Sequence, residues 1–188
     1  MSCKILVSTT VGWTSTARHA AGFALAGCEV EAIAPARAPV TLSRHVWGTH
    51  LYRALAPLRS LREAIRRAQP DLIVSCDDRA VQHLVQLYHC EPHNSAIAEA
   101  IERSLGAPEE YARILSRQAS MQTASELGIR TPETLPVPDG NALEDCLNAL
   151  GLPAVLKTDG SWGGEGVAIV KTRAAARSAY RRLSCAPS

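Results

Sequence analysis

The first part of the chain alternates short apolar runs with longer stretches whose apolar residues recur at helical spacing. Residues 4–9 are rich in β-branched side chains and predict a strand. An alanine-rich stretch at about 17–26 predicts a helix, for which Ser15 or Thr16 can serve as the N-terminal cap. Residues 29–34 predict a second strand. A strand, a helix and a strand at this spacing are typical of a parallel crossover unit.

The same alternation continues through a predicted helix at 58–68 and a buried strand at 71–76. Alternating strands and helices place helices on the faces of a parallel sheet. The sequence therefore predicts a Rossmann-like α/β domain in this part of the chain.

Several residues follow the predicted strands, where ligands collect at the carboxyl edge of a parallel sheet. We expect candidate substrate contacts at Gly12 and Trp13 after the first strand, and at Asp77 and Asp78 after the strand at 71–76. A purely structural role competes strongly for each. Gly12 then only turns the chain, Trp13 covers the sheet edge, and one of the two aspartates caps the helix that begins near Arg79.

The middle of the chain predicts consecutive helices. Apolar residues recur at helical spacing through 97–105, and Gly106 can end that helix. Another helix begins at Pro108, and Ser116 can cap a further helix through residue 127. Prolines then indicate an extended segment from residue 129. Helical patterns return at about 143–150 and at 172–183.

A glycine-rich segment joins two short apolar strands near the C-terminus. The strands are predicted at 153–157 and 167–171, and four glycines lie between them. Backbone amides in such a loop can turn toward a phosphate, and Lys157 adds a positive charge. The spacing fits neither a Walker A loop nor a dinucleotide-binding fingerprint. The alternative is a hairpin that merely turns, with Lys157 as a solvated cation at the strand end.

Composition excludes several classes of protein. The 188 residues are 46% hydrophobic and 20% charged, with a formal charge of +2, which is ordinary for a globular chain of one or two domains. This balance gives no reason to expect a nucleic-acid or membrane surface, and the basic residues at 59–67 fit the solvated face of a helix. The N-terminus lacks a signal-peptide pattern, so we expect a cytoplasmic protein.

Cysteine and histidine spacing gives little support for a metal site. The six cysteines lie far apart without a Cys-x-x-Cys motif, so we expect reduced, partly buried thiols. His83, His89, Cys90 and His93 form a loose cluster, but Pro92 interrupts the helix that would place His89 and His93 one turn apart. We expect no metal ligands in this chain.

The order of these parts resembles the ATP-grasp superfamily. The resemblance rests on the helix from Ser116 that continues into Gly-Ile-Arg-Thr-Pro, and on the segment Leu-Pro-Ala-Val-Leu-Lys-Thr-Asp-Gly-Ser-Trp-Gly-Gly-Glu-Gly-Val that begins at Leu152. It implies a pre-ATP-grasp α/β domain at 1–108. A small α+β lobe with the glycine-rich β-hairpin follows at 109–188, as the N-terminal subdomain of the ATP-grasp fold.

The resemblance implies ATP as the cofactor. The basic residue at the start of the first helix of this lobe and the lysine before the glycine loop would bind phosphates. The implied nucleotide contacts are Arg117, Lys157, Gly160, Ser161, Trp162, Gly163, Gly164, Gly166 and Val167. At the position of Arg117 the family more often has lysine. An exposed first-turn arginine without a ligand is the alternative for that residue.

The resemblance also implies a ligase reaction, in which ATP phosphorylates a small-molecule carboxylate and an amine or thiol attacks the acylphosphate. The sequence departs from the family at its end, because the second lobe, which supplies the Mg²⁺ ligands, is absent. We therefore expect either the N-terminal portion of a carboxylate ligase or a non-catalytic nucleotide- or partner-binding module. An unrelated Rossmann-like enzyme of the nucleotide-sugar or dehydrogenase kind is a further alternative. Exposed Val155, Ile169 or Trp162 would favour self-association as a homo-oligomer.

Overall fold

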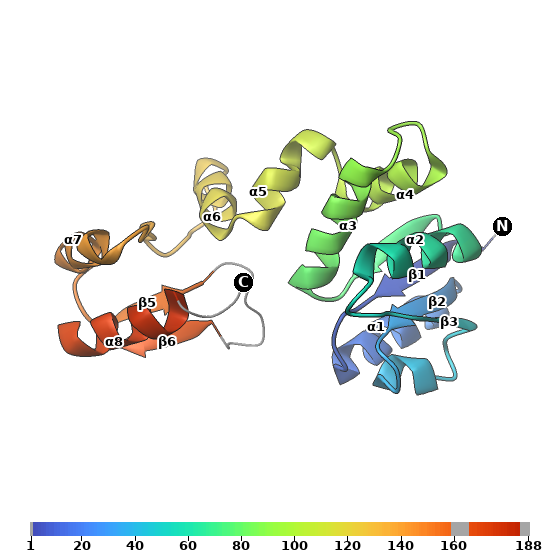
Figure 1. Cartoon of the computed structure of the whole chain (residues 1–188), viewed down its shortest axis with the longest axis horizontal. Coiled ribbons are helices and arrows are strands. Elements are labelled where there is room, and N and C mark those ends of the chain that lie inside the picture. The colour runs from blue at the N-terminus through green and yellow to red at the C-terminus, as the bar shows by residue number, and fades with distance from the viewer. Residues whose placement is uncertain (1, 159–165, 185–188) are drawn as a thin grey trace. The chain divides into compact units, whose positions relative to one another are not determined.

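The computed structural model describes residues 2–158 and 166–184. The chain divides into two compact units, unit 1 at Met1–Tyr111 and unit 2 at Ala112–Ser188 (Figure 1). Each unit has its own hydrophobic core. In the described part of the chain, no helix has the length and apolar character that crossing a membrane requires.

Unit 1 is built on a four-stranded parallel sheet. Its strands are β1 (Lys4–Ser8), β2 (Glu29–Ala34), β3 (Gly48–Leu51) and β4 (Leu72–Ser75), in the spatial order β3-β2-β1-β4. From β1 the chain adds β2 and β3 toward one edge of the sheet. It then returns to add β4 on the other side of β1, at the opposite edge. The predicted parallel α/β fold is confirmed.

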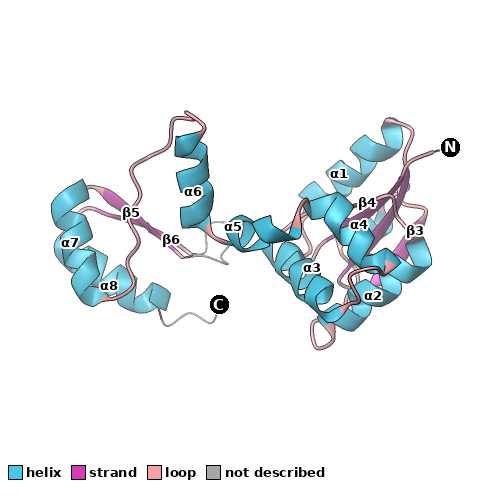
Figure 2. Cartoon of the chain, turned by 90° about the horizontal axis from the view of Figure 1, so that it is seen from above, coloured by secondary structure: helices cyan, strands magenta, loops and turns pink. Residues whose placement is uncertain are grey.

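Helices cover both faces of this sheet (Figure 2). The helix α1 (Thr14–Leu25) packs on one face through Ala20 against alternate residues of β1 and β2. The helices α2 (Pro57–Ala68), α3 (Asp78–Cys90) and α4 (Ala96–Leu105) pack on the other face, around Leu6 and Ile33. Gly106 ends α4 with a φ of 90°, a backbone conformation that favours glycine, as predicted.

Unit 2 joins helices to a two-stranded antiparallel hairpin. After the short helix α5 (Tyr111–Leu115) come α6 (Arg117–Glu126), α7 (Gly140–Leu150), β5 (Ala154–Lys157), β6 (Val167–Val170) and α8 (Arg173–Ser184). One face of the hairpin packs on α7 and α8, which contribute Leu143, Leu147, Ala176 and Ala179 to the core. The predicted small α+β lobe is confirmed.

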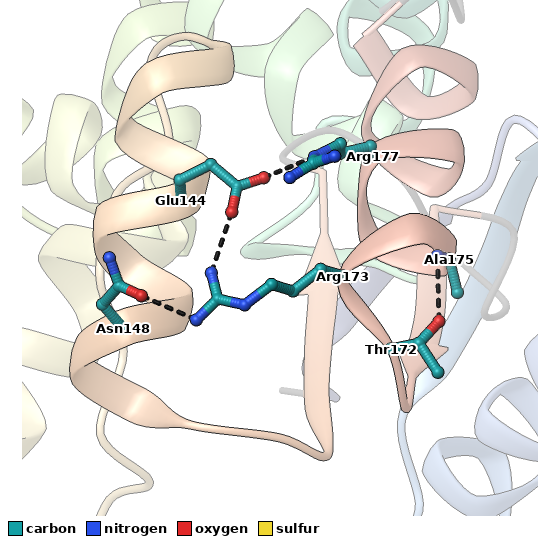
Figure 3. A network of polar contacts seen from close by, with 6 residues as sticks. All are labelled: Glu144, Asn148, Thr172, Arg173, Ala175 and Arg177. Carbon is teal, nitrogen blue, oxygen red and sulfur yellow. Dashed lines mark hydrogen bonds and ion pairs between the residues drawn. The ribbon is translucent and has the colours of Figure 1, made fainter.

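A charged network joins α7 to α8 on the surface (Figure 3). Arg173 and Arg177 of α8 each donate a hydrogen bond to the carboxylate of Glu144, at 2.8 and 2.6 Å. Arg173 also donates to Asn148 Oδ1 at 2.6 Å. These contacts fix the pairing of the two helices that support the hairpin.

Two predicted helix starts are corrected by the structure. The helix α1 begins at Thr14 rather than near residue 17, and neither Ser15 nor Thr16 caps it. Thr16 instead lies inside the first turn and is fully buried against the sheet. The helix α7 begins at Gly140, earlier than predicted, because Asp139 Oδ1 accepts hydrogen bonds from the amides of residues 141 and 142.

Candidate functional site

The hairpin of unit 2 presents two different faces. Lys157 pairs with Val167, and Val155 pairs with Ile169, so these four side chains lie on one face. That face is open to solvent, with Val155 at 51% and Ile169 at 72% exposure. The alternate residues of both strands point into the core of unit 2. The hairpin thus carries an aliphatic outer surface that ends in a lysine.

Lys157 is the last residue of β5, at the base of the glycine-rich segment. The next residue, Thr158, donates its amide hydrogen to the carbonyl oxygen of Gly166 at 2.9 Å, which continues the antiparallel pairing one step further. Gly166 is buried and Val167 begins β6. The other predicted nucleotide contacts, Gly160, Ser161, Trp162, Gly163 and Gly164, lie outside the described residues.

Arg117 is the first residue of α6 and is half-buried. Ser116 precedes it at the N-cap, where its Oγ accepts a hydrogen bond from the amide of Ala119 at 3.2 Å. The predicted cap is therefore confirmed. Arg117 stands at the positive end of the helix dipole, so its guanidinium and the first-turn amides present positive charge together.

The predicted substrate residues of unit 1 gather where β1 and β4 end. These two strands are neighbours in the sheet, and the chain leaves them toward opposite faces. Ligands of such sheets bind at the point between two strands of this kind. Gly12 and Trp13 follow β1 and are exposed. Asp77 and Asp78 follow β4, but only Asp78 is exposed.

Asp77 is buried and holds two segments together. Its carboxylate accepts hydrogen bonds from Thr9 Oγ1 at 2.9 Å, from the amide and hydroxyl of Thr10 at 2.7 and 2.8 Å, and from the amide of Ala80 at 2.9 Å. Asp77 is therefore the N-cap of α3 and also fixes the loop that leads to Gly12. Asp77 thereby holds in place the segments that form this edge of the sheet.

Sequence reasoning did not place several titratable residues near this edge. Burial raises the pKa of the Cys76 thiol to about 11, and His19 Nδ1 lies 3.7 Å from its sulfur. On the other face, burial lowers the pKa of His83 and raises that of Tyr52, and the two rings stack with centroids 6.0 Å apart. Tyr52 follows β3, a strand that the apolar pattern did not reveal, so only the pairing of β3 with β2 places it here.

The histidines near the end of α3 do not form one group. His83 contacts Tyr52, whereas the rings of His89 and His93 both lie against Tyr88. The helix ends at Cys90, before Pro92. Among residues 2–158 and 166–184, no group of three or more His, Cys, Asp or Glu side chains is placed to hold a metal ion.

Three solved structures resemble this chain. Carboxyaminoimidazole ribonucleotide synthase from Aspergillus clavatus, solved in complex with ATP, matches with a TM-score of 0.65 and 17% identity, covering 99% of this chain and 46% of that one. Phosphoribosylglycinamide synthetase from Anaerococcus prevotii matches with a TM-score of 0.45 and 16% identity, covering 100% and 44%. A glycinamide-RNase-transformylase T from Mycobacterium tuberculosis matches with a TM-score of 0.47 and 20% identity, covering 90% and 43%.

The chain thus spans less than half the length of each of these three structures. No protein-family model matches the sequence, and no curated protein matches it significantly. The likeness to the first structure extends over both units, from the parallel sheet to the hairpin and α8. The chain therefore has an ATP-grasp-related fold.

Proposed function

We propose that unit 2 binds ATP on the open face of the β5–β6 hairpin. The observation that carries this proposal is the shared exposed face of Lys157, Val155, Val167 and Ile169. Aliphatic side chains provide the apolar surface that an adenine ring covers, and an ammonium group attracts phosphate oxygens. Because Lys157 stands at the end of β5, the base lies along the strands and the triphosphate lies toward the glycine-rich segment.

The remaining phosphate contacts in this proposal come from backbone amides and from α6. Arg117 supplies a second cation, supported by the first-turn amides of its helix. The loop contacts are Gly160, Ser161, Trp162, Gly163, Gly164 and Gly166, as expected from the sequence. The likeness to a structure solved with ATP supports a nucleotide at an equivalent place in the fold.

We further propose that the chain is the N-terminal portion of an ATP-grasp carboxylate ligase. A substrate carboxylate would attack the γ-phosphorus of ATP and release ADP, and an amine or thiol would then displace phosphate from the acylphosphate. Mg²⁺, if bound by the second lobe of such an enzyme, would supply charge neutralisation at the phosphate oxygens. The residues of this chain hold and orient the triphosphate. Gly12, Trp13 and Asp78 border the candidate substrate edge, and Asp77 holds its loop in place.

Isothermal titration calorimetry of Mg-ATP with the chain and with Lys157→Ala tests the nucleotide site. We expect the substitution to weaken binding by roughly 10- to 100-fold, the typical effect of losing a charge-assisted contact. Lys171→Ala is the matched control, because Lys171 follows the opposite end of the hairpin. Equal weakening by both variants, or binding unaffected by Lys157→Ala, would contradict the proposed site.

A second candidate is a nucleotide-binding module without catalysis, which would use the same exposed face of the hairpin around Lys157. The two candidates differ in phosphoryl transfer. Transfer of ³²P from ATP to a carboxylate by the whole parent protein supports the ligase. ATP binding at Lys157 without any such transfer supports the binding module. A crystal soaked with nucleotide that shows the ligand at Gly12 would contradict both and favour a Rossmann-like enzyme of another kind.

A further inference from the structure

Two cysteines far apart in the sequence lie side by side where β1 and β2 begin. Lys4 pairs with Glu29 in the parallel register, and Cys3 and Cys28 immediately precede them. The amide of Glu29 donates a hydrogen bond to the carbonyl oxygen of Cys3 at 2.9 Å. One residue earlier on each segment, Ser2 Oγ donates to the carbonyl oxygen of Gly27 at 2.8 Å. These contacts hold Cys3 and Cys28 at adjacent positions.

The two thiols also share a face of the sheet. Cys3 lies two residues before Ile5, and Cys28 lies two residues before Val30, so both follow the alternation that directs Ile5 and Val30 toward α1. Cys28 packs against that cluster, while Cys3 is exposed. Cys28 lies close enough to the Cys3 side chain to influence the pKa of its thiol. Partial desolvation, followed by the neighbouring Cys28 and Asp71, raises the pKa of the Cys3 thiol.

Adjacent positions at the start of neighbouring strands are compatible with the Cα separation of a disulfide. Neighbouring strands lie about 4.7–4.9 Å apart, inside the Cα separation of about 4.4–6.8 Å that a disulfide spans. Both cysteines stand just outside the strands, where the backbone can adjust to the bond. We propose that Cys3 and Cys28 form a reversible intramolecular disulfide when the chain meets a low-molecular-weight disulfide. The spacing of the cysteines in the sequence gave no sign of this pair.

The exchange proceeds in two steps. The thiolate of the exposed Cys3 attacks one sulfur of the small disulfide, whose S–S bond breaks and releases one small thiol. The thiolate of Cys28 then attacks the Cys3 sulfur of the mixed disulfide and releases the second small thiol. Two protein thiols are oxidised and one small disulfide is reduced to two thiols. Each proton lost by a cysteine is taken up by a departing thiolate.

The proposal is tested on the full chain under native conditions with oxidised glutathione as the probe. After free thiols are alkylated, peptide mass spectrometry identifies the modified cysteines. We expect the loss of two free thiols per chain, a peptide that links Cys3 to Cys28, and recovery of both thiols with dithiothreitol. The Cys28→Ser variant instead retains a glutathione adduct at Cys3. The variant Cys90→Ser, which removes another exposed thiol, keeps the link.

Three results would overturn the proposal. One is a stable glutathione adduct at Cys3 in the wild-type chain with Cys28 free. The second is a link from either residue to a different cysteine. The third is the absence of a link under conditions that modify Cys90. As an independent readout, the oxidised wild-type chain should unfold several degrees above the reduced chain, because the link closes a loop through β1 and α1. In Cys3→Ser, whose exposed position tolerates serine, oxidised glutathione should cause no such shift.

Discussion

The carboxylate of Asp77 accepts hydrogen bonds from both the backbone amide and the hydroxyl of Thr10, although the two residues lie on different loops. Asp77 also caps α3 through the amide of Ala80. We therefore expect Asp77→Ala to lower the free energy of unfolding of unit 1 by about 2–4 kcal/mol, from the lost cap and the unpaired threonine groups. Urea denaturation followed by circular dichroism measures this effect.

Asp78→Ala is the control for that experiment. Asp78 is the exposed first residue of α3, so only its interaction with the helix dipole is lost. This costs about 0.3–1 kcal/mol. Equal effects at the two positions would contradict the structural role assigned to Asp77.

The two faces of the hairpin allow a matched comparison with one residue type. Val170 is 2% exposed and packs in the core of unit 2, whereas Val155 is 51% exposed on the opposite face. We expect Val170→Ala to lower the free energy of unfolding of unit 2 by roughly 1–3 kcal/mol, and Val155→Ala to change it by less than about 0.5 kcal/mol. Chemical denaturation of both variants tests this. The reverse order would mean that the assigned faces are wrong.

We expect the substitution of tyrosine by phenylalanine to have opposite effects on stability at two neighbouring tyrosines of unit 1, Tyr111 and Tyr88. The ring of Tyr111 is 2% exposed and its hydroxyl has no hydrogen-bond partner among the described residues. We expect Tyr111→Phe to leave the stability of unit 1 unchanged or to raise it by up to about 1–3 kcal/mol, because a buried unsatisfied group is removed.

The hydroxyl of Tyr88 instead donates to Glu102 Oε1 at 2.6 Å, and this hydrogen bond is the main reason that the pKa of Tyr88 rises to about 12. Tyr88→Phe should therefore destabilise unit 1, because the hydrogen bond to Glu102 is lost. Thermal unfolding of the two variants distinguishes them. A loss of stability in Tyr111→Phe would show that its hydroxyl has a partner.

The network between α7 and α8 predicts a pH dependence. Hydrogen bonds from Arg177 and then Arg173 lower the pKa of Glu144 below its ordinary value of 4.5. A carboxyl group whose pKa is lower in the folded state stabilises that state above its ordinary pKa, and the contribution disappears as pH falls through the folded pKa. Glu144→Gln should therefore destabilise unit 2 slightly near pH 7, and the difference from wild type should shrink as the pH falls below 4.5 and through the lowered pKa of Glu144.

Melting temperatures of wild type and Glu144→Gln across this pH range test the prediction. Asp145→Asn, at the next and exposed position of the same helix, is the control. High salt should reduce the difference at neutral pH, since exposed ion pairs are screened. A difference that grows as the pH falls would have the wrong sign for this network.

Much of the fold follows from local patterns, but one strand does not. The alternating apolar runs predicted β1, β2, β4 and the hairpin, because each carries several β-branched residues. The strand β3 reads Gly-Thr-His-Leu and has no apolar run. It is an edge strand that forms because its backbone pairs with β2, and such pairing between distant segments leaves little trace in the local sequence.

The local sequence likewise predicted only part of the candidate site. Alternation along β5 places Val155 and Lys157 on one face, but which face is open depends on where α7 and α8 pack. The partners of Asp77 lie nearly seventy residues earlier in the chain, so the sequence suggested a cap without the contacts to Thr9 and Thr10. Contacts set by sheet register, such as that between Cys3 and Cys28, likewise require the order of the strands.

The helix α6, whose residues are all described, has no fully buried side chain. Isolated helices shorter than about 12–15 residues are only marginally stable in water, and α6 has 10 residues. We therefore expect the position of Arg117 to depend on an equilibrium between helix and coil. A ligand that requires the helical form must supply the free energy of ordering the helix. Its binding enthalpy is then more negative than for binding to a preformed site, and its affinity falls more steeply on warming.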